Sequence, residues 1–450
     1  TEKYVKLNPR EHVLLKSSMY LGDTSIRNEE QYVFSDNNII KKQINWSPAL
    51  YKIFDEIIVN AYDQTIRDNT VSYIKVNITN RYICVKNDGI GLDIYIHKKH
   101  KVYIPELIFG NLMTSTNFAE DKERITGGTH GLGAKLTNIF SKRFDILVRD
   151  KIRKLEYRQT FRDNLTKIEK PIIKKYDGKS GGVQIKFYPD FKRFGMKELD
   201  QDHIDLFTKR VHDLSGLTKR KIYINDTKIP VNGWKEYLDL YDKNLILYSC
   251  NKHWKLGFKL ESNAYQISFV NGIFTNKNGK HMDHIVQQIY DKFSKSLKDI
   301  SKRWIRNNFT IILKTSIVNP SFNSQTKEEL MTPTSKFGIT CDLDSKFFKL
   351  IDISKLKELL KNLQSNVFAK TDGSKKSKIK GIPKLEDANY AGTKKSKDCI
   401  LILTEGDSAK ATAISGISAI KGGRNHYGVF PLKGKLLNVR DESMNKINKN

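Results

Sequence analysis

The sequence has no long apolar run and few cysteines, and each absence excludes a class of protein. No apolar stretch approaches the roughly 18–20 residues that a membrane-spanning helix needs, and no signal peptide opens the chain. The four cysteines, Cys84, Cys250, Cys341 and Cys399, lie far apart in the sequence. Their spacing indicates neither metal-ligand pairs nor a disulfide framework, and it fits a reducing compartment. We therefore expect a soluble, intracellular protein without a membrane partner.

Acidic residues are scarce relative to basic ones. The chain has 79 Lys and Arg against 50 Asp and Glu, which gives a formal net charge of +29. This excess favours a polyanionic partner, most simply nucleic acid, although a general bias toward lysine also produces it. With 450 residues, 38% of them hydrophobic, the chain is long enough for roughly two or three domains with apolar cores.

Residues 53–63 have the pattern of a helix with acidic and amide side chains along one side. Apolar residues recur there at three- and four-residue spacing. Glu56, Asn60 and Asp63 are spaced i, i+4 and i+7, so they project from nearly the same side. One interpretation is a partly solvated polar edge. The other is a site in which Glu56 activates a water molecule and Asn60 holds a hydrated Mg²⁺.

Glycine-containing segments follow this helix. A strand predicted over residues 82–86 runs into Asn87 and two glycines, which let the backbone bend tightly and approach a flat ligand. Asn87 offers an amide to a purine edge, although alone this segment is also an ordinary turn. Residues 127–135 carry four glycines before a helix, and their backbone N–H groups together with Lys135 suit an anion. The spacing is not that of a Walker-type P-loop.

The second half of the chain predicts another α/β unit and a basic linker. Strands are expected at about residues 254–260, 265–270 and 310–318, with a helix from about His284 and a long helical segment at about 345–368. Residues 373–384 contain five lysines and no acid, which is typical of a flexible basic linker.

An apolar strand at residues 399–403 is typical of a parallel sheet. It leads into Glu405, Asp407 and Ser408 ahead of a helix. These residues suit either a Mg²⁺ site at the carboxyl end of the strand or a helix N-cap.

The order of these segments resembles the Bergerat-type ATPase fold, which type II DNA topoisomerases share with heat-shock chaperones, mismatch-repair ATPases and histidine kinases. Residues 325–327, 379–385, 405–410 and 431–440 look like motifs of eukaryotic-type DNA topoisomerase II, and the similarity runs along essentially the whole chain. The resemblance implies an α/β (α+β) fold. Its expected parts are an N-terminal arm with a Bergerat (GHKL) ATPase sandwich (1–235), a ribosomal-S5-like transducer domain with a long helix (236–370), a basic linker (371–397) and the beginning of a Toprim α/β domain (398–450).

Carried over to matching positions, the resemblance implies an ATP site with Mg²⁺. Glu56 is the general base, Asn60 is the Mg²⁺ ligand, and Asn87 recognises adenine. Lys327 reaches the γ-phosphate from the second domain and shares the catalytic role. The other residues assigned to ATP are Asp63, Ser115, Thr116, Asn117, Gly128, Thr129, His130, Gly131, Leu132, Gly133, Ala134, Lys135, Gln325, Thr326 and, from an arm that crosses to the partner subunit, Tyr4.

The resemblance also implies sites for a second metal and for DNA. Glu405 matches the first acidic ligand of the Toprim Mg²⁺ site. The residues assigned to DNA, from matching positions or from basic runs, are Lys298, Lys302, Arg303, Lys378, Lys380, Lys435 and Asn438. In the lid, Thr129, His130 and Leu132 replace the usual eukaryotic Arg, Asn and Tyr and look more like the bacterial gyrase lid.

The function implied is that of an ATP-dependent type II DNA topoisomerase, acting as a homodimer on double-stranded DNA. We expect it in the nucleus, or at a viral replication site if the source is a large DNA virus. The family continues past the position of Asn450 with two further Toprim acids and the DNA-cleaving tyrosine. We therefore expect an N-terminal portion that closes a gate with ATP and does not cleave DNA by itself. The alternative is a Bergerat-fold DNA clamp or scaffold of mismatch-repair or chromatin type.

Overall fold

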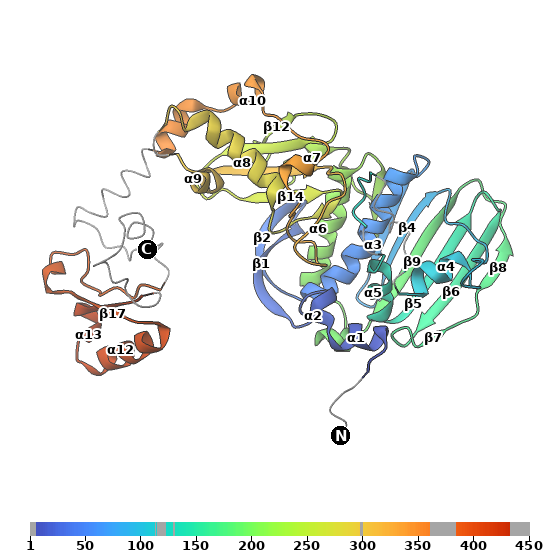
Figure 1. The fold of residues 1–450 in the computed structure, drawn as a ribbon, viewed down its shortest axis with the longest axis horizontal. Helices are drawn as coiled ribbons and strands as arrows, with labels where there is room; N and C mark the ends of the chain where they lie inside the picture. The colour runs from blue at the N-terminus through green and yellow to red at the C-terminus, as the bar shows by residue number, and fades with distance from the viewer. Residues whose placement is uncertain are drawn as a thin grey trace. The chain divides into compact units, whose positions relative to one another are not determined.

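The computed structural model describes residues 6–112, 114, 123–128, 131–297, 300–360 and 384–432. The chain divides into two compact units, Thr1–Asp352 and Ile353–Asn450, and Figure 1 shows the ribbon of each. The domain boundaries expected near residues 235, 370 and 397 stay predictions.

The first unit begins with two short helices, which a hairpin follows. The elements are α1 (Pro9–Leu15), α2 (Ser17–Tyr20), β1 (Arg27–Ser35) and β2 (Asn38–Trp46). The strands are antiparallel and are joined by Asp36 and Asn37, both with positive φ. Two-residue hairpin turns favour such residues because their twist matches that of the strands.

Helix α3 (Pro48–Arg67) lies at the centre of the first unit. It begins at a proline after Ser47, whose side chain accepts the Leu50 N–H, a favourable N-cap. Fourteen of its 20 residues are buried. A helix buried on most sides must find partners for its polar side chains within the protein, and those of α3 form the site described below. This confirms the helix predicted over residues 53–63.

A nine-stranded sheet packs beside this helix, in the order β11-β10-β3-β4-β9-β5-β6-β7 with β8 paired to β6. Its strands are β3 (Tyr73–Ile78), β4 (Ile83–Gly89), β5 (Ser141–Asp150), β6 (Leu155–Arg162), β7 (Lys167–Ile168), β8 (Ile172–Lys175), β9 (Gly181–Pro189), β10 (Lys221–Ile224) and β11 (Thr227–Lys228). In β3 every second residue is buried, so the sheet has one apolar face. Helices α3, α5 (Gly133–Ile139) and α6 (Gln201–Leu217) cover that face (Figure 1).

The remaining short elements of this region are α4 (Ile104–Gly110), η1 (Phe191–Phe194) and α7 (Trp234–Asp239). A five-stranded sheet follows, in the order β12-β13-β16-β14-β15. Its elements are β12 (Ile246–Ser249), β13 (Lys255–Leu260), β14 (Gln266–Val270), β15 (Ile273–Phe274), α8 (Lys280–Phe293), α9 (Lys302–Asn308), β16 (Phe309–Thr315), η2 (Thr334–Lys336) and α10 (Ser345–Lys349). The three predicted strands are confirmed, and α8 begins four residues before His284, the predicted start.

The long helix expected over residues 345–368 is interrupted. Helix α10 ends at Lys349, and helical backbone resumes over residues 353–360. Asp352 immediately precedes the second stretch, a position that Asp favours because its side chain caps a helix. The apolar periodicity of the sequence continues through this break, so it did not indicate that a second helix begins here.

Cys250 and Cys341 form a disulfide in the structure, which corrects the expectation that no disulfide is present. Their Cα atoms are 5.5 Å apart although 91 positions separate them in the sequence. The strand end after β12 and the loop before α10 meet only in the tertiary fold, so sequence spacing carried no signal for this pair. Cys84 and Cys399 are free and partly buried.

The second unit contains β17 (Ile400–Thr404), paired in parallel with β18 (Tyr427–Pro431), and α12 (Asp407–Ala419). The shorter elements are η3 (Ser396–Asp398) and α13 (Gly423–His426). The predicted parallel strand and the helix after it are thus confirmed.

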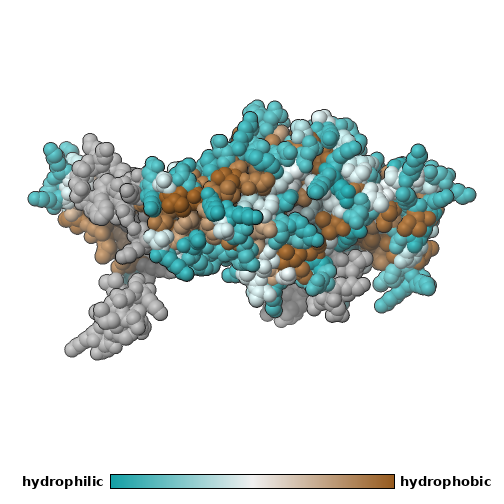
Figure 2. Space-filling view, turned by 90° about the horizontal axis from the view of Figure 1, so that it is seen from above, coloured by the Kyte–Doolittle hydropathy of each residue, from teal (hydrophilic) through white to brown (hydrophobic). Residues whose placement is uncertain are grey.

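Polar and charged residues predominate on the face of the molecule shown in Figure 2, with smaller apolar areas between them. None of the described helices is both long enough and apolar enough to span a membrane.

Candidate functional site

Segments far apart in the sequence line one cavity of about 860 Å³ in the first unit. This volume lies in the range of small-molecule sites. Its polar lining includes Glu56, Asn60, Asp63, Asn87, Lys135, Gln325 and Lys327. Its apolar lining includes Val85, Ile90, Leu92, Ile104, Leu107, Ile108, Val183 and Ile185. A mainly apolar pocket with a few convergent polar groups suits a flat ring that carries a charged extension.

The carboxylate of Glu56 is buried and held on several sides. Lys52, one turn earlier on α3, places its Nζ 2.8 Å from Glu56 Oε1, and Lys327 Nζ lies 3.9 Å from the same oxygen. Gly133 packs directly against this carboxylate, because a Cβ at Gly133 would lie 2.8 Å from Glu56 Cδ. Burial by itself lowers the pKa of Lys52, but the neighbouring carboxylates outweigh it and the pKa is raised. Lys52 therefore stays charged beside Glu56.

Asp63 holds the start of the glycine segment. Its two carboxylate oxygens accept the backbone N–H groups of Gly127 and Gly128, each at 2.8 Å. Burial raises the pKa of Asp63, and these two hydrogen bonds oppose the rise. Asp63 lines the cavity as predicted, but both of its oxygens bind backbone. We therefore infer that it positions the glycine segment.

Lys135 also contacts backbone at the edge of the cavity. Its Nζ donates to the carbonyls of Thr114, at 2.5 Å, and Gly131. Burial lowers the pKa of Lys135 to about 8. The Lys135 ammonium thus connects the backbone at Thr114 with the backbone at Gly131.

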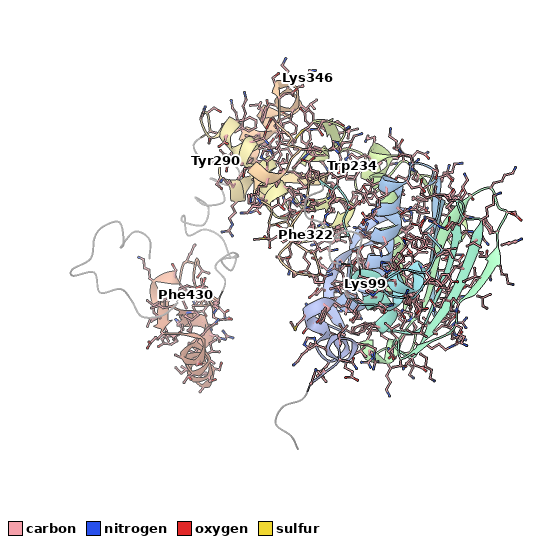
Figure 3. All side chains as sticks on the ribbon, turned by 45° about the vertical axis from the view of Figure 1, so that its right-hand side comes forward. Lys99, Trp234, Tyr290, Phe322, Lys346 and Phe430 are labelled. Carbon is pink, nitrogen blue, oxygen red and sulfur yellow. A yellow bond between two sulfur atoms is a disulfide. The ribbon has the colours of Figure 1, made fainter. Side chains whose placement is uncertain are left out.

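A loop after β16 carries Gln325 and Lys327 into the cavity. Lys327 is buried, has positive φ, and donates to the Gly127 carbonyl at 3.3 Å. Burial lowers the pKa of Lys327, and Glu56 opposes the shift. Thr326 does not line the cavity; its hydroxyl lies 2.6 Å from that of Ser324. Phe322, on the same loop, is labelled in Figure 3.

The turn after β4 requires its glycines. Gly89 has φ +117°, and a Cβ there would lie 2.8 Å from Val71 Cγ2. Gly91 has φ +84°, and its Cβ would lie 2.8 Å from the carbonyl carbon of Arg149. Both positions therefore exclude larger residues. Asn87 is buried beside this turn and donates to the carbonyl of Asp88 at 2.8 Å.

Comparisons with known proteins place this geometry in a family. A family model described as DNA gyrase B matches residues 204–380. The crystal structure of the ATPase region of Saccharomyces cerevisiae topoisomerase II is similar with a TM-score of 0.78 and 36% identity, covering 80% of this chain and 99% of that one. The chain belongs to the type II DNA topoisomerase family. The ATPase and transducer domains of topoisomerase II from Balamuthia mandrillaris match with a TM-score of 0.77 and 34% identity, covering 82% of this chain and 99% of that chain.

Full-length members of the topoisomerase family extend well beyond this chain. The probable DNA topoisomerase 2 of Dictyostelium discoideum is 41% identical over 99% of this chain and 31% of its own length. DNA topoisomerase 2 of Candida glabrata is 39% identical over 100% of this chain and 34% of its own length. The chain thus spans about a third of these relatives. The mixed α/β fold and the family resemblance are confirmed, and the clamp or scaffold alternative is not favoured.

The predicted topoisomerase site residues fall into three groups. Those that line the cavity are Glu56, Asn60, Asp63, Asn87, Gly128, Gly131, Leu132, Gly133, Ala134, Lys135, Gln325 and Lys327. Those outside the described residues are Tyr4, Ser115, Thr116, Asn117, Thr129, His130, Lys298, Lys378, Lys380, Lys435 and Asn438. Those described away from the cavity are Thr326, Lys302, Arg303 and Glu405.

The last three of these are exposed. Lys302 and Arg303 lie at the start of α9, with Lys302 Nζ 5.8 Å from the ring centre of Tyr290, which is labelled in Figure 3. Glu405 follows β17. Among the described residues, no group of three or more His, Cys, Asp or Glu is placed to hold a metal ion.

Sequence reasoning missed several residues of the topoisomerase cavity. Arg67 lines it four residues after Asp63 on α3, and Lys52 pairs with Glu56 four residues before it. Arg67 and Lys52 each lie four residues from a predicted site residue, so the same helical spacing could have identified them from the sequence. His97 and His100 also line the cavity, with ring centres 4.8 Å apart, and nothing in the sequence pattern pointed to them.

Proposed function

We propose that this chain is the ATP-operated, dimerising gate of a type II DNA topoisomerase, and that it hydrolyses ATP. The observation that carries the proposal is the convergence of Glu56 and Lys327 on one cavity. One comes from the central helix and the other from a loop beyond the second sheet. An acid for the attacking water and a cation for the terminal phosphate are the two groups that such a hydrolysis needs.

The described residues fit a nucleotide with Mg²⁺. The apolar part of the cavity and the buried Asn87 accommodate a purine, and Gly131 to Lys135 line the part of the cavity that also holds Glu56, where the phosphates would lie. Asn60 is exposed on α3 one turn beyond Glu56, and an amide oxygen is a suitable Mg²⁺ ligand. When bound, Mg²⁺ supplies positive charge that offsets the charge of the phosphates.

In this mechanism Glu56 orients a water molecule and accepts its proton. Lys52 and Gly133 fix the direction of the carboxylate, since one pairs with it and the other leaves room only for its present position. Lys327 donates to the terminal phosphate, and Asp63 holds the backbone of Gly127 and Gly128 in place.

The activity of the whole enzyme is part of the same proposal. ATP binding in two subunits closes the gate, with Tyr4 crossing to the partner, and hydrolysis removes the contact of Lys327 and reopens it. In the complete protein this cycle drives one DNA duplex through a double-strand break in another, with Glu405 contributing to a Toprim Mg²⁺ site. The transducer and linker contact DNA phosphates, and the nucleus is the expected location.

The test is ATP turnover against protein concentration for this chain and for Glu56→Gln. We expect a rate that rises faster than linearly with concentration, because the active form is a dimer. Glu56→Gln is expected to lose at least about 100-fold in turnover while still binding nucleotide, because it removes the general base. Glu30→Gln, an exposed glutamate on β1, is the matched control and should retain full turnover. Linear dependence would contradict the dimeric gate, and turnover that survives Glu56→Gln would contradict the assignment of the base.

A further inference from the structure

The nine-stranded sheet has an open face opposite α3, α5 and α6. In Figure 1 its strands form the right-hand side of the first unit with these helices to their left, and Figure 3 brings that right-hand side forward. Cross-strand pairing places Tyr223, Lys75 and Lys86 in one row, and Lys221 lies beside Tyr73. These side chains alternate with buried apolar residues on the same strands, so they lie on the face away from the core.

Aromatic rings support the lysines of this face. Lys75 Nζ lies 4.9 Å from the ring centre of Tyr223 and 5.6 Å from that of Tyr73. Lys186 Nζ, on β9, lies 3.7 Å from the ring centre of Tyr82, which directly precedes β4. Each ring favours a cation above it, which holds the ammonium groups at the surface of the sheet. The lysines therefore cover these rings, which are not free to stack on bases.

Two acids of the outer face are already paired with arginines. Asp145 pairs with Arg143 at 2.9 Å and accepts from the Thr160 hydroxyl at 2.7 Å. Glu156 pairs with two arginines, Arg149 at 2.8 Å and Arg158 at 2.7 Å. By contrast, the lysines Lys75, Lys86, Lys186 and Lys221 form no ion pair within the described part of the chain. The face therefore presents several positive charges without internal partners.

The basic surface continues at the edge of the sheet. A small cavity of about 50 Å³ beside β10 and β11 is lined by Lys219, Arg220, Lys221 and Lys228, and no acid lines it. Lys228 pairs with Tyr223 across the hairpin, so it lies on the same face as the lysine row. A cavity of this size holds roughly one or two water-sized groups, which matches the oxygens of a single phosphate.

We propose that this open sheet face binds the backbone of duplex DNA, at a site separate from the transducer, linker and Toprim contacts. Six strands from β10 to β6, about 4.8 Å apart, span roughly 24 Å. At 3.4 Å per base pair this covers roughly seven base pairs. A duplex is favoured over a single strand because the tyrosine rings are occupied by lysines and do not offer stacking platforms. This assignment of the sheet face rests on the proposed function in one respect, which is that the polyanion is taken to be DNA.

The experiment compares duplex binding by the whole chain with binding by Lys75→Gln/Lys86→Gln/Lys186→Gln. Anisotropy of a labelled 20-base-pair duplex is measured between about 50 and 200 mM KCl. Three lost phosphate contacts are expected to reduce the slope of log K against log salt by about 2.7 and to weaken binding at least tenfold at the lowest salt. The control Lys16→Gln/Lys192→Gln/Lys197→Gln changes three exposed lysines that lie outside both the sheet face and the expected transducer. It should leave the slope within about 1 of the wild-type value.

A slope and an affinity that match the unaltered chain would overturn the proposal, as would an equal loss in the control. A larger loss for a single-stranded oligonucleotide than for the duplex would overturn the choice of duplex. ATP turnover without DNA, measured in parallel, should not change in the triple variant, because these lysines face away from the cavity. If the unaltered chain does not turn over ATP, the proposed function fails. The comparison of duplex binding by the unaltered chain and the triple variant still tests whether the sheet face binds DNA.

Discussion

Gly133→Ala tests the packing that holds the proposed general base. Gly133 is the first residue of α5, and its Cα lies against the Glu56 carboxylate. An added Cβ would lie 2.8 Å from Glu56 Cδ and 3.1 Å from its Cβ, while carbon atoms in favourable contact are about 3.5–4.0 Å apart. Glu56 therefore has to move by roughly 0.7 Å or more, out of its 2.8 Å contact with Lys52.

The expected magnitude differs for activity and for stability. A catalytic group displaced by about 1 Å loses about 100-fold in rate. Overpacking costs about 1–3 kcal/mol, whereas alanine in place of glycine stabilises a helix by up to about 1 kcal/mol. The free energy of unfolding should therefore fall by no more than about 2 kcal/mol while turnover falls about 100-fold.

The assay measures the turnover number for ATP, the Kd of a fluorescent nucleotide and thermal unfolding on the same preparation. Gly416→Ala is the matched control, because Gly416 lies within α12 and a Cβ there meets no atom within 4 Å. It should keep full turnover. The reasoning is refuted if Gly133→Ala keeps more than half of the wild-type turnover, or if turnover falls only in proportion to unfolded protein.

Two further predictions concern buried charges. Arg210 is fully buried and donates to Asp55 at 2.6 Å and to the Gly272 carbonyl at 2.7 Å. Because Arg210→Ala leaves Asp55 buried without this partner, it should lower the free energy of unfolding by about 3–5 kcal/mol. Urea unfolding measures this change, and a loss under about 1 kcal/mol would contradict the prediction. Burial lowers the pKa of Lys314 to about 7, so between about pH 7 and 10 the unfolded chain binds more protons at this residue and stability rises with pH. Lys314→Met should make that rise smaller. The urea midpoints of the unaltered chain and of Lys314→Met are measured at pH 7 and 9.5, and a rise of equal size in both proteins would contradict the assignment.

Helix α3 and several strands could be predicted because their signals are local. The apolar spacing of residues 53–63 and the line of Glu56, Asn60 and Asp63 depend only on helical geometry, and the structure shows α3 with these residues on the cavity. Strand patterns likewise identified β4, β13, β14, β16 and β17 within a few residues. The interrupted helix before Asp352 was missed because local periodicity continues through the break.

What could not be predicted depends on contacts between distant segments. The partnership of Arg210 with Asp55 and the disulfide between Cys250 and Cys341 join residues about 90 or more positions apart. No spacing rule relates such positions, since they meet only after the strands have assembled. For the same reason the sequence held no signal for the hydrogen bonds from the backbone N–H groups of Gly127 and Gly128 to Asp63, whose assignment to the nucleotide stays a prediction.

The most informative long-range contact is the one at Gly127. Asp63 accepts its N–H, and Lys327 donates to its carbonyl, so one residue of the glycine segment is held from opposite sides by the central helix and by the loop after β16. Lys327 also lies 3.9 Å from Glu56, so the lysine that the proposed mechanism assigns to the terminal phosphate touches both the base and the segment beside the nucleotide. Any ligand that moves this ammonium changes both contacts at once, because one Nζ makes them both. In the proposed gate, gain or loss of the phosphate therefore changes the glycine segment and the transducer loop together, through a shared residue and without a separate relay.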